Sequence, residues 1–522
     1  MRHINIKKII KGGLFSGFLL LGLSACEDYD FPVDKSYDKT FRPPSFKAEA
    51  IRATSVRLEW DPIYDAAQYV LELSQDSLVF NNPVQYELPL AQDSITLRDL
   101  YSATRYSARI RALGREGKPD SEFNVLTFAT LGEQIFTEVV PGFDDESNSN
   151  YLDLSWLEGS MVTHIEVLAV DAEPVVYALD EAAIESASFR LEDLAAATEY
   201  TIGIYRDANR RGWYEYSSFP AYPDGARFVE DGEDLAALLT GATEEQLVLV
   251  LEAGAVFDIG ELQLSSAIDR LEILANPTQA KPVLQTTRIQ NNNASAWVFR
   301  NLEITGNVGK FFMDERNTTP LAEVLMDGCY IHSYRGVLRL DGNDNHTQIN
   351  SITINNSVLE NIADYGVVNG GRNGGYRIEE LVLSNSTING VQSRVFDIRR
   401  DGGLYRIENC TFYNAVGNNR EVLFTENGSA ALELRNTIFG KMFDQGEDVV
   451  VRSTNQSLAG DFVFNSYALS DFVISENHPF AGIALYPKAS VDVFADPENG
   501  DFSIIDNAFT GRVDAGDPRW RP

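Results

Sequence analysis

Two matching segments carry the side chains in this sequence that are best suited to bind an anion. "GRNGGYRI" (Gly371–Ile378) and "RRDGGLYRI" (Arg399–Ile407) share an arginine, a Gly-Gly pair and a Tyr-Arg-Ile ending. A guanidinium group binds a carboxylate through two parallel hydrogen bonds, and two stacked guanidiniums repel unless an anion lies between them. The tyrosines can stack on sugar rings. We therefore predict an anion-binding site formed by Arg339, Arg372, Tyr376, Arg399, Arg400, Asp401 and Tyr405.

The same arginines also have candidate partners within the chain. Asp341, Asp397 and Asp401 align close to them, and Arg339, Asn369 and Asp397 align as one column. Such a column can equally be a salt-linked ladder in which the charges neutralise one another. The sequence leaves both alternatives open, a face that meets a ligand and a face that is purely structural.

Both segments belong to a repeat that runs through the C-terminal half. After residue 295, strands that alternate apolar and polar residues each run into an Asn or Asp. The shared polar positions, 24–29 residues apart, are Asn301, Asp327, Asn356, Asn385, Asn409, Asn436 and Asn465. A repeat of this length with short strands and no helix predicts a parallel β-helix. Asn suits its bends because it tolerates the left-handed conformation, and stacked amides can form a ladder.

Cys410 is the other residue whose type could carry chemistry. In the repeat it takes the position of Ser357 and Ser386, so we predict a small residue that lines the inside or a turn. Cys329 lies three turns away, roughly 14 Å, which is beyond the reach of a disulfide. We therefore predict no reactive thiol at Cys410.

The N-terminus carries a targeting pattern. Basic residues precede the apolar run "LFSGFLLLGL", and "LSAC" ends at Cys26. The run is too short for a stable transmembrane helix. The pattern resembles a bacterial lipoprotein signal, which implies a signal peptide over 1–25, lipidation of Cys26 and a tether over 26–42. The following "EDYD" resembles the surface-export signal of Bacteroidota lipoproteins, which implies an outer-membrane protein that faces the exterior.

The next two stretches alternate like short, half-buried strands. The first has Trp60 and "LYSATRY" (Leu100–Tyr106), and the second has Trp156 and "LAAATEY" (Leu194–Tyr200). A strand tryptophan followed by L-x-x-x-T-x-Y resembles the fibronectin type III sandwich, which usually serves as a spacer or a binding platform. The resemblance covers residues 43–131 and 135–228.

Residues 229–522 resemble the right-handed parallel β-helices of the pectate-lyase-like superfamily. The repeat and the closing segment "FADPENGDFSIIDNAF" (Phe494–Phe509) carry this resemblance. The fold class expected is therefore all-β, with two fibronectin type III-like sandwiches followed by a right-handed parallel β-helix. The combination resembles surface proteins of Bacteroidota polysaccharide-utilisation systems.

The superfamily includes lyases that use a Lys or Arg base with calcium on uronate polymers, and hydrolases that use paired aspartates. Lys310 and "DER" (Asp314–Arg316) are the nearest candidates for such a base and acid set. They do not reproduce a lyase's calcium-binding acids together with its base, and no aspartate pair is clearly spaced for hydrolysis. We assign no catalytic residue, metal or resident cofactor, and calcium is kept as an option.

The net charge of the chain limits the classes of partner that it can bind. The chain has 522 residues with 43 Lys and Arg against 77 Asp and Glu, a net charge of −34, which argues against nucleic acid as a partner. The first hypothesis is a lipid-anchored surface protein that binds an acidic polysaccharide such as pectin or alginate without catalysis. The second is a polysaccharide lyase on the same substrates, and the third is a structural or adhesion protein. The resemblance also implies an outer-membrane glycan-import complex as a partner.

Overall fold

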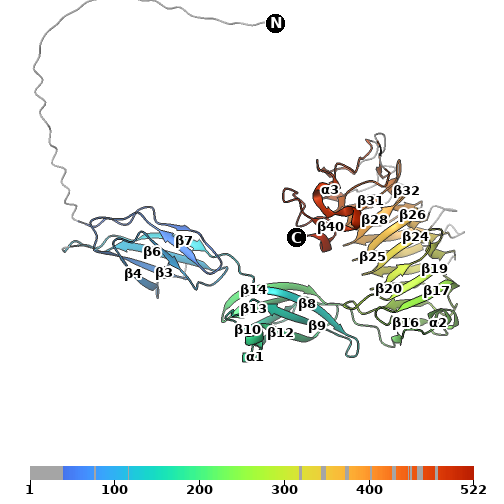
Figure 1. Ribbon diagram of the computed structural model, residues 1–522, viewed down its shortest axis with the longest axis horizontal. Helices are drawn as coiled ribbons and strands as arrows, with labels where there is room; N and C mark the ends of the chain where they lie inside the picture. The colour runs from blue at the N-terminus through green and yellow to red at the C-terminus, as the bar shows by residue number, and fades with distance from the viewer. Residues whose placement is uncertain are drawn as a thin grey trace, which may run out of the picture. The chain divides into compact units, whose positions relative to one another are not determined.

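The structure is a computed structural model, and it is all-β apart from short helices (Figure 1). Cys26, Arg372, Arg400 and Asp401 lie outside the residues that it describes. Two compact units divide the chain. One contains the first sandwich, and the other contains the second sandwich and a parallel β-solenoid. The described residues are 39–75, 78–115, 117–316, 320–341, 348–370, 376–399, 402–425, 431–444, 446, 450–454, 462–476 and 480–522.

The first sandwich has sheets of three and four antiparallel strands, the arrangement expected of a fibronectin type III-like domain. Trp60 and Tyr69 pack in its core, and the Tyr106 hydroxyl accepts a hydrogen bond from the Tyr101 amide at 2.7 Å. The strands, in sheet order, are β1 (Lys47–Glu49), β2 (Val56–Glu59) and β5 (Ser94–Leu97), then β4 (Val84–Pro89), β3 (Gln68–Ser74), β6 (Arg105–Ala112) and β7 (Asn124–Ala129).

The second sandwich repeats this arrangement. Trp156 is buried in its core, and the Tyr200 hydroxyl accepts from the Ala195 amide at 2.8 Å, again five residues upstream. A short helix, α1 (Glu181–Ser186), is an addition that we did not expect. The strands are β12 (Ser188–Leu194), β9 (Ser149–Trp156) and β8 (Phe136–Asp144), then β11 (Val175–Ala178), β10 (His164–Ala169), β13 (Glu199–Arg206) and β14 (Asn209–Ser217).

The solenoid begins with helix α2 (Leu235–Gly241). Asp234 caps this helix by accepting from the Ala237 amide, and Leu235 and Leu239 close the end of the core. The first face of the solenoid is a ten-stranded parallel sheet. Its strands in order are β15 (Arg227–Val229), β16 (Gln246–Leu251), β18 (Arg270–Leu274), β20 (Ala296–Arg300), β23 (Leu321–Asp327), β25 (Gln348–Asn355), β27 (Arg377–Ser384), β30 (Leu404–Glu408), β33 (Ala431–Arg435) and β36 (Phe462–Phe464).

A second parallel sheet supplies the other two faces. Its second-face strands are β17 (Val256–Gln263), β19 (Val283–Gln290), β21 (Glu303–Thr305), β24 (Tyr330–Leu340), β26 (Val358–Asn369), β28 (Thr387–Val391), β31 (Thr411–Ala415), β34 (Ile438–Phe439), β37 (Tyr467–Ala468) and β38 (Ala484–Leu485). The third face consists of β22 (Phe311–Glu315), the C-terminal halves of β24 and β26, then β29 (Phe396–Ile398), β32 (Glu421–Thr425) and β35 (Arg452–Thr454). We call one turn through the three faces a rung.

The predicted asparagine ladder forms the bend between the first and second faces. Asn385, Asn409, Asn436 and Asn465 all have left-handed φ angles, from 44° to 54°. Each of the last three donates its amide to the side-chain oxygen of the one before it, at 3.0–3.1 Å. One predicted member is wrong: Asp327 pairs with Arg300 and Asn355, and Gly328, with a φ of 65°, takes the bend position.

Small polar side chains line the inside of the solenoid next to this bend. Cys410 follows the bend as Ser386 and Ser357 do in their rungs, which confirms its predicted position. Both Cys410 and Cys329 are buried and free. Burial raises the pKa of the Cys329 thiol to about 11 and raises that of Cys410 as well, so neither is a nucleophile at neutral pH.

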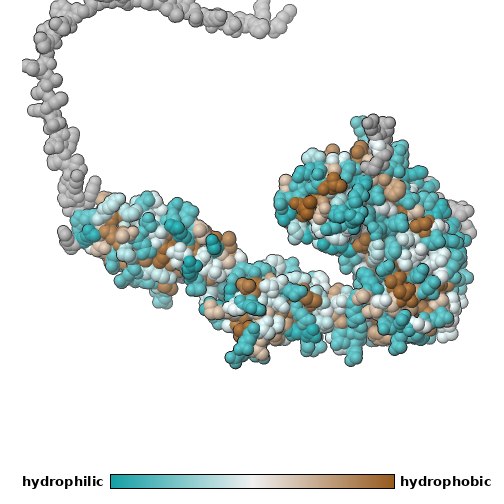
Figure 2. All heavy atoms as spheres, in the orientation of Figure 1, coloured by the Kyte–Doolittle hydropathy of each residue, from teal (hydrophilic) through white to brown (hydrophobic). Residues whose placement is uncertain are grey.

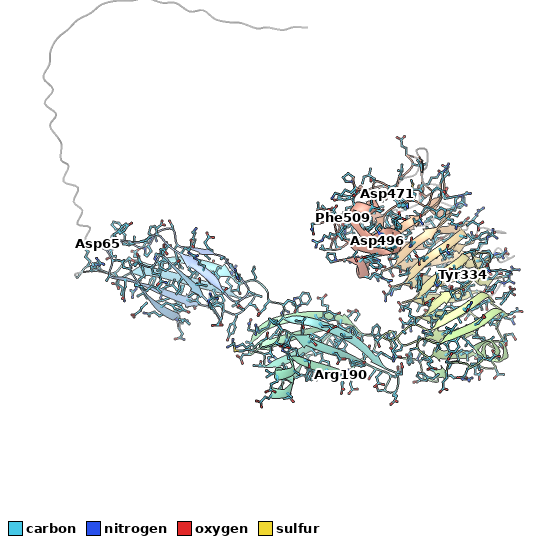
Figure 3. All side chains as sticks on the ribbon, in the orientation of Figure 1. Asp65, Arg190, Tyr334, Asp471, Asp496 and Phe509 are labelled. Carbon is cyan, nitrogen blue, oxygen red and sulfur yellow. The ribbon has the colours of Figure 1, made fainter. Side chains whose placement is uncertain are left out.

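The C-terminal segment folds back over the second face, against the expectation that strands run to the end. It contains α3 (Ser490–Val493), β39 (Phe494–Asp496), β40 (Asp501–Ile504) and two short 3₁₀ turns, and it lies beside β28 and β31 (Figure 1). Phe494, Phe502 and Phe509 pack on Tyr413 and Ile438. We call residues 490–522 the cover segment, and Figure 3 marks it by Asp496 and Phe509.

Candidate functional site

The predicted column Arg339–Asn369–Asp397 is confirmed by strand register. Arg339 of β24 pairs with Asn369 of β26, which pairs with Asp397 of β29. The column extends by one rung at each end, to Asp314 of β22 and Phe424 of β32. Because neighbouring parallel strands lie ~4.8 Å apart, these side chains form a row along the solenoid axis. The row lies on the third face.

The first ion-pair network surrounds Asp314. Its Oδ2 accepts from Arg288 at 2.9 Å and lies 2.8 Å from Arg316 and 3.6 Å from Arg339. The network continues from Arg339 to Asp341, at 2.5 Å, and from Arg288 to Glu261, which Lys310 approaches at 3.5 Å. Four cations therefore share three carboxylates in this network.

The second ion-pair network lies three rungs further along the face. Asp397 pairs with Arg399 at 2.9 Å and with Arg394 at 3.4 Å. Arg394 also binds Glu421 at 2.6 Å, and Glu421 lies 3.2 Å from Arg452. Three arginines and two carboxylates thus alternate, with an arginine at each end.

Three carboxylates and three arginines of the networks differ strongly in side-chain exposure. The side chains of Asp314, Asp397 and Glu421 are at most 6% exposed, whereas those of Arg316, Arg399 and Arg452 are 32–48% exposed. These three carboxylates lie deeper than these three guanidiniums, whereas Arg288, Arg339 and Arg394 are themselves largely buried. A buried carboxylate is tolerated because charge-assisted hydrogen bonds from arginine replace its lost hydration. The face consequently presents cations to the solvent over anions that hold them in place.

Aromatic rings lie under several of these guanidiniums. The Arg394 and Arg399 guanidinium carbons lie 4.2 and 5.0 Å from the centroid of the Phe424 ring. At the other end, Arg339 lies 4.9 Å from the ring of Phe311. Contacts of this kind attract the cation to the ring face and restrict its side chain. They are a second reason for the arginines to keep fixed positions.

Tyr376 and Tyr405 do not belong to this face, and our alignment of their segments is wrong. Tyr405 pairs with Leu381, five residues beyond Tyr376, because the chain from Asn369 to Leu381 is four residues longer than the paired stretch from Asp397 to Tyr405. Both side chains point into the core and each residue is 1% exposed. Burial raises the pKa of the Tyr376 hydroxyl, which lies 3.4 Å from Glu315. Neither ring has a free face on which a sugar could stack.

Among the predicted arginines, Arg339 and Arg399 are described, and both take part in the networks. Their pairing with Asp341 and Asp397 matches the structural alternative. The predicted Arg372, Arg400 and Asp401 lie outside the described residues, so the structure does not place them. Sequence reasoning missed Arg288, Arg394, Glu421 and Arg452. Each of them lies within two residues of an end of its strand (β19, β29, β32 or β35), a signal that becomes visible only once the strands are in register.

Lys310 and Asp314 fit poorly as a catalytic base and acid. Lys310 lies 3.5 Å from Glu261, and Asp314 is buried beneath three arginines. Within the described ranges, no group of three or more His, Cys, Asp or Glu side chains is placed to hold a metal ion. Over the same residues, no helix is long and apolar enough to cross a membrane.

Comparisons with known proteins bear on parts of the chain. A family model described as a domain of unknown function (DUF5123) matches residues 405–520, the last rungs together with the cover segment. A search of curated proteins gave no significant match.

Solved structures match the sandwiches. A two-domain fibronectin type III segment from chicken tenascin is 17% identical, with a TM-score of 0.22, and covers 34% of this chain and 97% of its own. The fn3 domain of the human collagen alpha-1(XX) chain is 21% identical, with a TM-score of 0.17 and coverages of 19% and 91%. The FN1–FN3 domains of chicken CNTN1 are 14% identical, with a TM-score of 0.17 and coverages of 36% and 70%.

Proposed function

We propose that this protein binds an acidic, uronate-containing polysaccharide on the third face of its solenoid and that it does so without catalysis. The proposed setting is the outer surface of a Bacteroidota outer membrane, to which lipidated Cys26 anchors the chain. The proposed role is in a polysaccharide-utilisation system that passes the bound glycan to an import complex.

The observation that carries the proposal is the layered charge of the third face. Ion pairs between described residues join seven cations to five carboxylates, in a protein whose net charge is −34. Three of these carboxylates, Asp314, Asp397 and Glu421, are buried beside the exposed arginines Arg316, Arg399 and Arg452. A row of fixed guanidiniums favours a linear anion, because exposed arginines such as Arg316 and Arg452 have more N–H donors than one carboxylate accepts. Pectin and alginate supply carboxylates along an extended chain.

The cations also argue for binding over chemistry. A lyase base must be neutral when it takes the substrate's proton, and the ion pairs of the network arginines favour their charged form. In the described part of the third face, the one lysine of the networks is paired with Glu261. Binding without turnover is therefore favoured over the lyase alternative.

One experiment separates the three hypotheses. Purified full-length protein is run through native gels containing pectin, polygalacturonate, alginate or neutral glucans, and the same mixtures are monitored for the absorbance of unsaturated uronate. We expect retardation by the acidic polymers and no new absorbance. New absorbance would identify a lyase. Unchanged mobility in every gel would leave the structural or adhesion role.

The anchor is tested separately. Cells expressing the protein and its Cys26→Ser variant are labelled with a radioactive fatty acid and then treated with external protease. We expect label and surface digestion for the parent chain and no label for the variant. Label in the Cys26→Ser protein would show that the lipid, if present, is attached elsewhere.

A further inference from the structure

The two ion-pair networks are separate along the solenoid. The first is centred on Asp314 of β22, and the second continues to Glu421 of β32. Register places β24, β26 and β29 between these two strands, so the centres are four rungs apart, ~19 Å. Asn369, a neutral side chain, lies between them in the column.

Each network ends in an exposed arginine that its buried carboxylate does not need for neutralisation. Arg316 shares Asp314 with Arg288 and Arg339. At the far end, Arg452 shares Glu421 with Arg394, which holds the closer contact. One carboxylate charge cannot satisfy two or three guanidiniums, so donors remain at both ends of the face.

We infer that the third face holds two anion subsites, one at Arg316 and one at Arg452, which a single extended polymer bridges along the solenoid axis. This inference rests on the proposed function and adds a geometry to it. A uronate residue in an extended polymer advances by about one rung height, ~5 Å. Arg452 lies on β35, five rungs from Arg316 beside β22, so the two subsites are ~24 Å apart along the axis. Residues n and n+5 of the polymer carry charges at this spacing, so the shortest bridging ligand is a hexasaccharide.

Bridging has a measurable signature. A short oligomer fills one subsite, whereas a longer one fills both, and its second contact is intramolecular. Affinity is therefore expected to rise at least ~10-fold between the trimer and the heptamer, with the step near the hexamer. A face that binds anions uniformly along its length would instead gain affinity gradually.

The test is calorimetric titration of full-length protein with oligogalacturonates of three to seven residues. Arg316→Gln and Arg452→Gln each remove one subsite, and each leaves its carboxylate with at least one arginine, so the fold is retained. We expect either variant to lose the step while it still binds trimers. Arg406→Gln is the matched control, because Arg406 pairs with Glu433 at 3.1 Å on the first face, and its titrations should equal those of the parent.

The outcomes separate the inference from the proposed function. A step in the parent that disappears in both third-face variants supports two subsites. Binding that grows smoothly with length, or a step that survives both substitutions, overturns the two subsites and leaves polysaccharide binding intact. An absence of heat with every oligomer and with polygalacturonate overturns both.

Discussion

Asp314 shows how one residue organises the third face. It is buried, and three arginines from three rungs converge on its Oδ2. A buried ion pair contributes little net stability, but loss of one partner leaves the others buried and unpaired. The position of every guanidinium in the first network therefore depends on this carboxylate.

Asp314→Asn should lower the free energy of unfolding by about 1–3 kcal/mol, because the three guanidiniums lose their shared buried anion while Arg288 and Arg339 keep Glu261 and Asp341. Chemical denaturation monitored by circular dichroism measures the change. Asp364→Asn is the control: Asp364 pairs with Arg335 at the surface, so its loss should cost less than ~1 kcal/mol. Equal losses for the two variants would contradict the role of burial.

The two core thiols permit a second test at the residue scale. In a Cys26→Ser background, Cys329 and Cys410 should not react with a thiol-specific disulfide reagent at pH 8, since both are buried and both pKa values are raised. Two thiols should react once the protein is unfolded in guanidinium chloride. Rapid reaction of either thiol in the native protein would show that the rungs open locally.

The asparagine ladder is the clearest case at the scale of the element. Its amides stack because every bend repeats the same left-handed conformation, which fixes the side-chain direction from rung to rung. Asn409 sits in the middle of the ladder. It donates to Asn385 and accepts from Asn436 and, at 2.9 Å, from Arg521 of the cover segment.

Two variants of Asn409 distinguish the stability contributed by its backbone conformation from that contributed by its side-chain hydrogen bonds. Asn409→Gly keeps the left-handed bend and loses the ladder bonds, at a cost of about 1–2 kcal/mol. Asn409→Ala loses the bonds and also adopts a disfavoured φ, so it should be less stable by a further ~1–2 kcal/mol. Thermal unfolding of the pair gives the difference. An alanine variant as stable as the glycine variant would mean that the bend relaxes.

The sequence predicted the strands and bends of the solenoid more accurately than the candidate binding site. The reason is physical. The ladder repeats one local conformation, so Asn409 and Cys410 could be placed from their neighbours in the chain. The site depends on register across connections of different length. Tyr376 and Tyr405 lie in similar sequence segments. The chain from Asn369 to Leu381 is nevertheless four residues longer than the paired stretch from Asp397 to Tyr405, which puts Leu381, not Tyr376, beside Tyr405. Partners such as Arg394 and Glu421 are 27 residues apart and meet only when rungs stack.

At the scale of the whole molecule, the cover segment divides the solenoid surface. It buries the outer side of β31 and β34 through Tyr413 and Ile438, while the third face carries the charged networks. Polar contacts fix it, among them Thr387 donating to Asp517 at 2.7 Å. The side of the molecule seen in Figure 2 is mostly hydrophilic, with smaller apolar patches.

Removal of residues 490–522 should expose the apolar patch beneath them. We expect the shortened protein to bind a hydrophobic dye and to unfold at a lower temperature than the full chain, because large apolar side chains lose their burial. Val513→Ser is the control, since Val513 is 65% exposed and its loss should leave both measurements unchanged. If the shortened chain unfolds at the same temperature as the full chain, the cover segment does not stabilise the solenoid.

The cover segment also affects the order in which parts of the solenoid can fold. Residues 490–522 leave the ribosome after every strand they cover, so the second face of the solenoid has no partner while the chain is being made. Rungs that fold early present Tyr413 and Ile438 to whatever surrounds them until synthesis passes residue 509. A chain that crosses a membrane before it folds avoids this exposed stage.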